Sequence, residues 1–438
     1  MWNGAIDRRP ALIARVSGAA DVVTAVRFAG EQGLPVSIRG GGHSAPGFAV
    51  ANGALMIDMS DVKEIRIDPA ARVAVAGSGL LWSELDAATQ AYGLATTGGV
   101  VGDTGVAGLT LGGGLGFMDR LAGLTCDNLL GAEVVTADGQ VLQADENTNP
   151  DLFWALRGGG GNFGVVTSFT YRLHPVTEVF GGLLGYTMDR ATDVLQAYRE
   201  VGADAPDRLA LYAGLVAAPP APFVPEHLRG QRVVGLIPVY FGPAYEAARA
   251  LAPLLAVAPP VLDLTKPMSY QEVQRLTDGL NPPAMQHYYT AEWLRNLDDQ
   301  TIGELVTAAD APSPLSVITL KRMGGAAGRV PADATPFWYR DAAYLLDFHA
   351  QWAPGSPAGP HVAWARTARQ VAARDSAGGG YVNFIGADQG ADRVRAAYGG
   401  NYARLTQVKA AYDPGNLFRI NNNIPPAVAA GNGDRDGS

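Results

Sequence analysis

Three glycine clusters are the first features of this sequence that point to ligand chemistry. They are Arg39-Gly40-Gly41-Gly42-His43-Ser44, Leu111-Gly112-Gly113-Gly114-Leu115-Gly116 and Arg157-Gly158-Gly159-Gly160-Gly161-Asn162-Phe163-Gly164. Because glycine lacks a Cβ atom, successive backbone N–H groups can converge on a phosphate. A single cluster of this kind is often only a loop. Three of them, each next to an expected strand or helix, favour a backbone cradle for a ligand that contains a polyphosphate.

Several other chemistries are excluded because their motifs are missing. The string Gly159-x-Gly161-x-x-Gly164 follows an expected helix and precedes an expected strand, which reverses the order that a nicotinamide dinucleotide site requires. The sequence contains no Walker A loop and no Gly-x-Ser-x-Gly elbow. Its six histidines show no metal-binding spacing, and Cys126 is the only cysteine, so we expect no metal site and no disulfide.

The whole-chain composition limits the class of partner. The net charge is −9 and no run of Lys or Arg occurs, which argues against a nucleic-acid partner. No stretch of 18 apolar residues is uninterrupted by charge, and the first residues lack the apolar core of a signal peptide. We therefore expect a cytoplasmic protein without membrane contact, a monomer or a homodimer, from a GC-rich bacterium as its alanine content suggests.

The elements that must position the glycine clusters follow from hydrophobic spacing. Residues 20–33 predict a helix that stops at Gly33, with apolar positions at Val22, Val23, Val26 and Phe28. Asp138-Gly139 predicts a hairpin turn inside residues 129–145. Further strands are expected within residues 35–40, 54–60, 65–77, 232–242 and 316–325, and further helices within 83–93, 150–158, 191–202 and 244–255.

This order of elements predicts an α+β protein with two lobes, because 438 residues exceed the usual size of one hydrophobic core. The glycine clusters fall in residues 1–177. Residues 178–395 differ in composition and in the expected elements, with longer Ala/Leu-rich helices between strands. Residues 396–438 begin with a helix stopped by Asp413-Pro414-Gly415, continue as an extended segment, and end in about a dozen residues that we expect to be disordered.

Four segments together resemble a known family. PVSIRGGGHS, GVAGLTLGGGLG, ALRGGGGNFGVVTSFTYRL and the terminal YDPGNLFRINNNIPP resemble the vanillyl-alcohol-oxidase-type flavoproteins, and most closely their berberine-bridge-enzyme-like branch. The resemblance covers nearly the whole chain. It implies a PCMH-type FAD-binding domain in residues 1–177, completed by the C-terminal segment. It also implies a substrate domain in residues 178–395, with a large antiparallel sheet flanked by helices.

The resemblance further implies how FAD is held. Arg39 to Ser44 (Arg39, Gly40, Gly41, Gly42, His43 and Ser44) would wrap the pyrophosphate, and an imidazole nitrogen of His43 would bond covalently to the flavin 8α-methyl group. Val101 stands where many relatives have a second, cysteinyl attachment, and Cys126 fits a buried core thiol better, so a single linkage is expected. Other residues placed around FAD are Asp103, Gly105, Gly108, Gly112, Gly113, Gly116, Gly161, Asn162, Gly164, Val165, Asn383, Asn421 and Asn423.

The resemblance also assigns residues to the chemistry. Thr104 would lie beside the reactive flavin edge and leave room for O2, and with Leu109 it also resembles relatives that form a flavin-N5-oxygen adduct. Tyr381, in the segment Tyr381-Val382-Asn383-Phe384, would be the base or proton relay, provided that its surroundings lower its pKa from about 10. Phe384 replaces a tyrosine of the family pattern, which puts any role of a second hydroxyl in doubt.

Two pairs of residues in the central lobe are candidates for substrate contact. Tyr288 and Tyr289 fall in an expected strand, whose alternation allows only one to face a pocket. Lys321 and Arg322 could steer an anionic substrate or could lie on an exposed sheet edge.

The favoured function is an FAD-dependent oxidase that takes a hydride from a C–O or C–N bond of a small molecule, such as a secondary metabolite, and passes electrons to O2. A flavin-N5-oxide monooxygenase and a non-redox cyclase with the same fold remain alternatives. A ligand-binding or storage protein fits the three glycine clusters least well.

Overall fold

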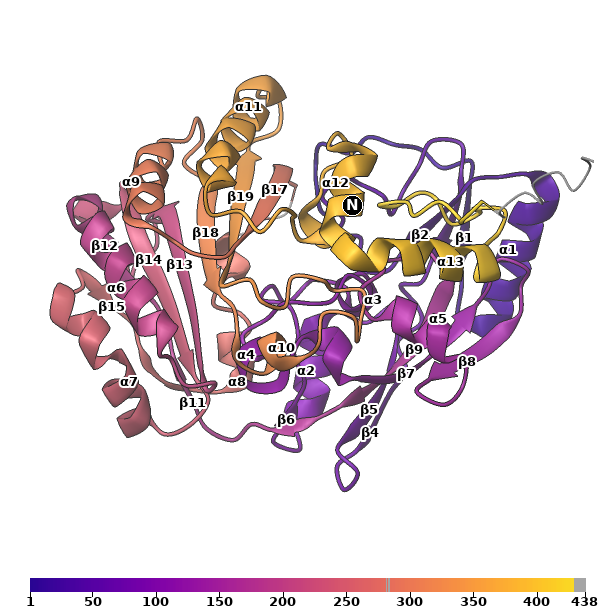
Figure 1. The fold of residues 1–438 in the computed structure, drawn as a ribbon, viewed down its shortest axis with the longest axis horizontal. Helices are drawn as coiled ribbons and strands as arrows, with labels where there is room; N and C mark the ends of the chain where they lie inside the picture. Colours follow the sequence, from indigo (N-terminus) through magenta and orange to yellow (C-terminus); the bar gives the residue numbers. More distant parts are fainter. Residues whose placement is uncertain (281, 283, 429–438) are drawn as a thin grey trace, which may run out of the picture.

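The computed structural model describes residues 1–280, 282 and 284–428 of the chain. The expected disordered end therefore lies largely outside the described residues. Two lobes lie side by side, one built mainly from the first third of the chain and the other from its centre (Figure 1). The N-terminal residues lie at the joint, where the Trp2 backbone N–H donates to the Gly42 carbonyl (3.1 Å) and the Gly4 N–H to the Met285 carbonyl (2.8 Å).

The first lobe contains two main sheets. A parallel sheet of order β1-β3-β2 combines β1 (Leu12–Arg15), β3 (Leu55–Asp58) and β2 (Val36–Arg39). An antiparallel sheet of order β4-β5-β9-β7-β8 combines β4 (Ile65–Asp68), β5 (Val73–Gly77), β9 (Val165–Arg172), β7 (Leu129–Val135) and β8 (Val141–Asp145). The short strands β6 (Leu94–Ala95) and β10 (His174–Pro175) pair separately. The helices of this lobe are α1 (Ala19–Gln32), α2 (Trp82–Gln90), α3 (Val106–Leu111), α4 (Asp119–Ala122) and α5 (Pro150–Leu156).

Local signals in this lobe act as expected from the sequence. Helix α1 ends where Gly33 takes a left-handed conformation (φ 62°), which costs glycine no Cβ clash. Gly139 makes the β7–β8 turn with φ 76°. The buried face of α1 differs in part from the expected one. Val22 and Val26 are buried, together with Ala25 and Ala29, but Phe28 is 40% exposed.

The second lobe is built on a nine-stranded antiparallel sheet. Its main path runs β15-β12-β14-β13-β18-β19-β17. Beside this path, β11 pairs with β14, and β16 pairs with β11. The strands are β11 (Val179–Gly181), β12 (Leu184–Thr187), β13 (Leu209–Ala217), β14 (Arg232–Tyr240), β15 (Leu262–Asp263), β16 (Lys266–Met268), β17 (Gln286–Leu294), β18 (Val317–Arg322) and β19 (Tyr344–Trp352). The large antiparallel sheet is thus confirmed.

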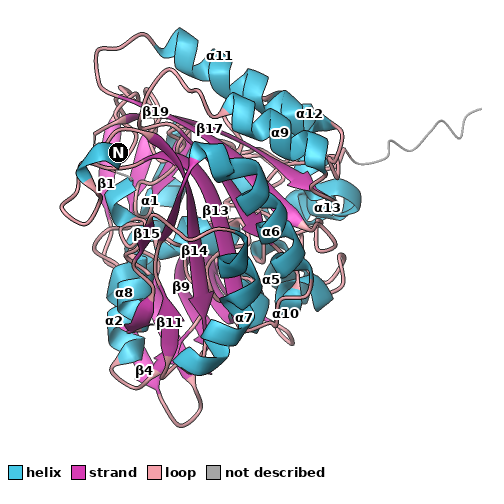
Figure 2. Cartoon of the chain, turned by 90° about the vertical axis from the view of Figure 1, so that its left-hand side faces the viewer, coloured by secondary structure: helices cyan, strands magenta, loops and turns pink. Residues whose placement is uncertain are grey.

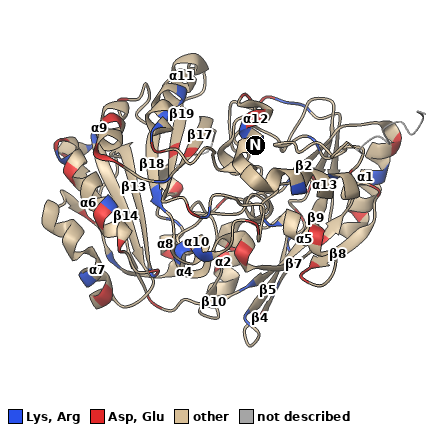
Figure 3. Ribbon diagram, in the orientation of Figure 1, with Lys and Arg blue, Asp and Glu red and all other residues tan. Residues whose placement is uncertain are grey.

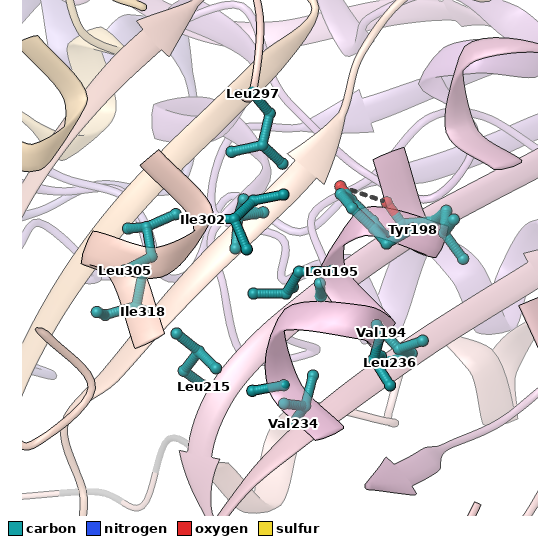
Figure 4. Packing of buried hydrophobic residues seen from close by; sticks show 14 of the residues in the cluster. Val194, Leu195, Tyr198, Leu215, Val234, Leu236, Leu297, Ile302, Leu305 and Ile318 are labelled. Atoms are coloured by element: carbon teal, nitrogen blue, oxygen red, sulfur yellow. Dashed lines mark hydrogen bonds between the residues drawn. The ribbon is translucent and has the colours of Figure 1, made fainter. Parts of the chain in front are cut away.

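Helices cover only one face of this sheet (Figure 2). They are α6 (Ala191–Ala203), α7 (Ala244–Val257), α9 (Asp299–Ala308) and α11 (Ala358–Arg369), while α8 (Tyr270–Val273) and α10 (Gly325–Arg329) lie near the joint. In the core beneath them, Leu195 and Tyr198 of α6 and Ile302 of α9 pack on Leu215 and Leu236 of the strands (Figure 4). The opposite face of the sheet turns toward the first lobe.

The C-terminal segment returns to the first lobe, through α12 (Gly390–Tyr398) and α13 (Tyr402–Tyr412) (Figure 1). Val382 and Val394 already belong to the core of that lobe, so the return begins near residue 382 rather than at 396. The buried Lys409 side chain fixes the C-terminal segment on the first lobe. Its Nζ pairs with Asp413 (2.6 Å) and donates to the carbonyls of Asn162 (2.7 Å) and Phe418 (2.9 Å).

Charged residues of both signs are interspersed over the two lobes (Figure 3). Among the described residues, no three His, Cys, Asp or Glu side chains come together as a metal site would require. No helix in the same part of the chain has the length and apolar character needed to span a membrane.

Candidate functional site

A cavity of about 490 Å³ lies between the two lobes, a size typical of cofactor and small-molecule sites. In the first lobe the wall includes all of Gly40–Ser44 as well as Val101, Thr104 and Gly105. The third glycine cluster adds its second half, from Gly160 to Gly164 without Phe163. The cavity wall in the second lobe is the uncovered face of the sheet, from strands β13, β14, β17, β18 and β19. The C-terminal return contributes Tyr381, Asn383, Phe418, Asn421 and Asn422.

The loop after β2 brings its backbone, not its arginine, to the cavity. Gly40, Gly41, Gly42, His43 and Ser44 line it, and Gly42 has φ 72°. The guanidinium of Arg39 instead donates to both carboxylate oxygens of Asp58 (2.9 Å each). The structure therefore corrects the expectation for Arg39, which anchors the base of the loop and does not line the cavity.

Two glycines of this region let neighbouring loops touch backbone to backbone. A Cβ added to Gly41 would lie 2.5 Å from the Gly105 nitrogen, and one added to Gly105 would lie 2.4 Å from the Gly41 nitrogen. Both distances are far shorter than real Cβ contacts. Only glycine at both positions permits this cradle, which Gly108 extends along the cavity wall.

The second glycine cluster has a different role from the expected one. Gly112, Gly113 and Gly116 do not line the cavity. A Cβ on Gly112 would lie 2.2 Å from Asn383 Oδ1, one on Gly113 would lie 2.8 Å from Phe337, and one on Gly116 would lie 1.7 Å from the Gly98 carbonyl oxygen. These glycines are needed for close packing behind the wall.

The third cluster does reach the cavity, where Gly161, Asn162, Gly164 and Val165 line it. The Asn162 side chain donates to the Gly159 carbonyl (2.9 Å) and accepts from the Ile424 N–H (3.0 Å), so it ties this loop to the C-terminal return. Asn421 strengthens the connection by donating to the Gly161 carbonyl (3.0 Å). Asn421 and Asn422 line the cavity, whereas Asn423 does not.

His43 is held on two sides. Its Nε2 lies 2.9 Å from Asp103 Oδ1, and its ring stacks on the Trp2 indole with centroids 4.3 Å apart. The other face of Trp2 stacks on His287 of β17 (3.7 Å). Asp103 itself does not line the cavity, and it contacts the cavity wall through His43 Nε2. Trp2 was not predicted, because it stands 41 residues before His43 in a segment without a motif.

Tyr381 lies buried in the cavity wall, with a side chain only 3% exposed. The Gly114 N–H (3.2 Å) and the Asn383 amide (2.8 Å) both donate to its hydroxyl oxygen. Burial raises the pKa of Tyr381 above its ordinary value, and the hydrogen bonds from Asn383 and Gly114 oppose that rise. The protein surroundings alone therefore do not lower this pKa. With both lone pairs of the oxygen occupied, the O–H is left to donate elsewhere.

The two tyrosines of β17 separate as strand alternation requires. Tyr289 lines the cavity and stacks on His349 (4.0 Å) and Phe384 (5.0 Å). Tyr288 points to the opposite side, where its hydroxyl donates to Asp388 (3.1 Å), and this contradicts a substrate contact for it.

The Lys321–Arg322 pair is also corrected, because β18 is a central strand and not an edge. Lys321 lines the cavity but is buried and ion-paired with Asp119, and it donates to the Gly116 carbonyl (2.9 Å). Arg322 points to the other face, donating to the carbonyls of Gly202 and Ala343. Neither side chain offers an unpaired charge to an anionic substrate.

Two polar residues of β19 in the cavity wall were missed. Burial raises the pKa of Asp347 from 3.8 to about 8, while the Thr319 hydroxyl donates to it (3.3 Å). His349 Nε2 lies 2.8 Å from His287 Nδ1, and burial lowers the pKa of both histidines. Asp347, His349 and Gln351 stand at alternate positions of β19, between apolar residues, and this pattern was an available signal.

The cavity fits a long cofactor with a polyphosphate, such as FAD, on two grounds. Backbone from two glycine-rich loops forms one wall with no side chain in the way. Five lining residues each keep a buried side-chain oxygen without a hydrogen-bond partner among the described residues, namely Ser78, Tyr212, Asp347, Tyr398 and Asn421. Such atoms normally find a partner, and a bound polar ligand would supply it. Thr104, Val101 and Leu109 line the cavity near His43, where a compact side chain leaves space.

Comparison with known proteins agrees with this geometry. The FAD binding domain family matches residues 10–145, and the berberine and berberine-like family matches residues 380–425. An uncharacterized FAD-linked oxidoreductase, YgaK of Bacillus subtilis, is 31% identical over 97% of this chain and 93% of its own. The (R)-6-hydroxynicotine oxidase of Paenarthrobacter nicotinovorans is also 31% identical, over 97% of this chain and 93% of its own.

A solved structure extends the agreement to the fold. The crystal structure of 6-hydroxy-D-nicotine oxidase from Arthrobacter nicotinovorans superposes with a TM-score of 0.84 at 29% identity, covering 98% of this chain and 94% of the other. With the glycine cradle, the two-lobed cavity and the C-terminal return in place, the chain belongs to the berberine-bridge-enzyme-like family of FAD-linked oxidoreductases.

Proposed function

We propose that this FAD-linked oxidoreductase is an oxidase that removes a hydride from a C–O or C–N bond of a small organic molecule, with O2 as electron acceptor. The observation that carries the proposal is the Tyr381 hydroxyl. It is buried at the joint of the lobes, fixed by two N–H donors, and part of the same cavity wall as His43 and Thr104.

Bound FAD would supply a two-electron acceptor for the hydride. The chain itself would supply a proton acceptor for the substrate O–H or N–H. Tyr381 is proposed for this task, because Gly114 and Asn383 would stabilise a phenolate by donating two hydrogen bonds to its oxygen. A positive or strongly polar ligand next to the phenol is needed to overcome the burial that raises its pKa.

FAD is proposed to be linked covalently through His43 alone. His43 lines the cavity, and Val101 occupies the lining position where a second attachment would need a thiol. Cys126 is fully buried in a core cluster outside the cavity, and burial raises the pKa of its thiol. These positions therefore favour one covalent bond between the protein and FAD, at His43.

The substrate is proposed to be a compact, largely apolar molecule. The sheet wall presents Tyr289, Ile237 and Leu345, and Phe384 of the C-terminal return stacks on Tyr289. Burial raises the pKa of Asp347 in this wall to about 8, which favours its neutral form. Apolar walls with few polar groups favour ring systems with one or two hydrogen-bonding positions.

A monooxygenase that works through a flavin-N5-oxygen adduct is the second candidate. Thr104 and Leu109 both line the cavity, which is the observation that favours it. The two candidates differ in the fate of O2. An oxidase releases one H2O2 for each substrate oxidised, whereas a monooxygenase inserts an oxygen atom into its product and releases less.

An anaerobic screen tests the proposal. Alcohols, cyclic amines and polyketide phenols are mixed with the holoenzyme without O2, and the visible flavin absorbance is recorded. We expect at least one class to bleach the flavin, and admission of air to restore it with stoichiometric H2O2. Product formation without bleaching would contradict the proposal and indicate a non-redox cyclisation.

A further inference from the structure

The side chain of His43 is constrained more tightly than a loop histidine needs to be. Asp103 holds Nε2 at 2.9 Å, and Trp2 covers one face of the ring at 4.3 Å. The loop carrying Asp103 follows the cavity-lining residue Val101, and Trp2 comes from the other side of the joint. Two separate segments thus converge on one imidazole.

Asp103 fixes the tautomer of the imidazole. A carboxylate oxygen only accepts hydrogen bonds, so in the neutral imidazole Nε2 carries the hydrogen and Nδ1 carries the lone pair. The hydrogen bond from His43 lowers the pKa of Asp103, which keeps it ionised near neutral pH. Among the described residues, no group hydrogen-bonds to Nδ1, and His43 lines the cavity. Nδ1 is therefore the nucleophilic nitrogen of this ring.

Trp2 fixes the plane of the imidazole. The indole is clamped between His43 and His287, with ring planes inclined by 19° and 15°. Its backbone N–H donates to the Gly42 carbonyl, and the neighbouring Asn3 side chain donates to the carbonyls of Ala45 (2.6 Å) and His287 (3.0 Å). A ring anchored in this way limits rotation of the imidazole about its side-chain bonds.

We propose that Asp103 and Trp2 are positioning residues that hold Nδ1 of His43 in place for self-attachment of the flavin. This inference rests on the proposed His43 linkage. Nδ1 bonds to the 8α carbon as one C–H bond of the methyl group breaks, and two electrons reduce the flavin. Dioxygen then takes these electrons and two protons to give H2O2. The alkylated ring keeps its Nε2–H against the Asp103 carboxylate, which stabilises the positive charge until the proton leaves to solvent.

The exposure of Asp103 makes the inference testable without loss of the fold. Its side chain is 58% exposed, and ion pairs this exposed contribute about 0–1 kcal/mol to stability. Asp103→Leu has a similar shape and accepts no hydrogen bond. Asp103→Asn keeps an acceptor oxygen for the Nε2–H but has no charge. Asp7→Leu, at a side chain that is 88% exposed and far from His43 in its contacts, is the matched control.

The measurement is the rate at which newly expressed full-length protein, in aerated cells supplied with riboflavin, gains covalent flavin by intact mass. Total bound FAD and the thermal midpoint are recorded in parallel. We expect Asp103→Leu to attach flavin about 10–100-fold more slowly with unchanged total FAD, and Asp7→Leu to match wild type. Asp103→Asn should be slowed less than Asp103→Leu, because it keeps the acceptor oxygen and loses only the charge. Attachment by Asp103→Leu at the wild-type rate would overturn the role of Asp103, and so would equal slowing by Asn and Leu.

Trp2 is tested with a conservative and a disruptive variant. The Trp2 Nε1 has no hydrogen-bond partner among the described residues, so Trp2→Phe keeps a stacking ring without losing a bond. We expect Trp2→Phe to attach flavin within about threefold of wild type and Trp2→Leu to be about tenfold slower. Equal rates for Phe and Leu would overturn the role of the stack.

The failure of this inference is distinguishable from the failure of the proposed linkage. If wild type itself carries only noncovalent FAD, the His43 linkage is wrong. If wild type is covalent and all Asp103 and Trp2 variants are equally fast, only the positioning roles are wrong. Peptide fragmentation of the flavinylated segment, with NMR of the isolated histidyl flavin, identifies the substituted nitrogen, and substitution at Nε2 would contradict the Nδ1 assignment.

Discussion

At the residue scale, the Tyr381 hydroxyl carries most of the proposed chemistry and can be removed with little change in shape. In Tyr381→Phe we expect hydride transfer to slow by about 10²–10⁴-fold, since a positioned proton acceptor contributes on that order. Two N–H groups lose their acceptor, which costs about 1–3 kcal/mol of stability. Anaerobic stopped-flow reduction of the flavin measures the rate.

Tyr186→Phe is the matched control for this change. Tyr186 is buried in the core of the second lobe, lies outside the cavity, and its hydroxyl has no partner among the described residues. Its removal should leave the reduction rate unchanged. An equal rate in Tyr381→Phe and wild type would rule out Tyr381 as the base.

Sequence reasoning named some of the residues that line the cavity and missed others for a physical reason. His43, Thr104, Tyr289 and Tyr381 do line the cavity. Asp347 and His349, which line the cavity, and Trp2, which stacks on His43, are brought there by contacts between segments far apart in the chain, and no local motif encodes such contacts. Gly112, Gly113 and Gly116 were misassigned because a glycine that packs against a neighbour looks in sequence like one that approaches a ligand.

At the scale of elements, the contact between the loop after β2 and the start of α3 is the critical joint of the cofactor wall. In Gly105→Ala, the new Cβ would meet the Gly41 backbone nitrogen at 2.4 Å, so the loops must separate. We expect a loss of about 1–3 kcal/mol of stability and a reduced content of bound FAD. Thermal unfolding and the FAD-to-protein ratio provide the measurement.

Gly30→Ala within α1 is the control, since no atom lies within 4 Å of its added Cβ. It should gain up to about 1 kcal/mol from helix propensity and keep its FAD. If Gly105→Ala behaves like Gly30→Ala, the two loops are not a close-fitting cradle.

Helix ends and turns that depend on neighbouring residues could be predicted from the sequence, whereas the pairing of strands in the large sheet could not. The α1 stop at Gly33 and the β7–β8 turn at Gly139 follow from residues next to each other in sequence. The order β14-β13-β18-β19-β17 depends on the pairing of β13 with β18, two strands more than a hundred residues apart, and it decides that β18 is central and that Lys321 is buried. The return of the C-terminal segment at residue 382 likewise depends on Val382 and Val394 finding the first lobe's core.

At the scale of the whole molecule, two buried carboxyl groups set a pH dependence of stability. Burial raises the pKa of Asp86 from 3.8 to about 7, against a hydrogen bond from Gln274, and raises that of Asp347 to about 8. Between about pH 4 and these values the folded protein holds protons that the unfolded chain has released. Stability therefore falls as pH rises from about 4 to 8 and levels off above, by an amount on the order of a few kcal/mol.

Asp86→Asn, which lies outside the cavity, isolates one of these groups. Because asparagine stays neutral, we expect a flatter profile of unfolding free energy between pH 5 and 7, measured by chemical denaturation at constant ionic strength. A variant profile as steep as that of wild type would show that Asp86 does not hold a proton in the folded state.

The most direct test of the account is the intact mass of the denatured protein, because we propose that the cavity, its glycine cradle and the constrained His43 all serve one covalently held cofactor. We predict that wild type gains the mass of one FAD less two hydrogens, located on the peptide that contains His43. His43→Ala should fold, retain FAD only noncovalently and show the unmodified mass. Complete release of FAD from denatured wild type, or an adduct that persists in His43→Ala, would contradict the account.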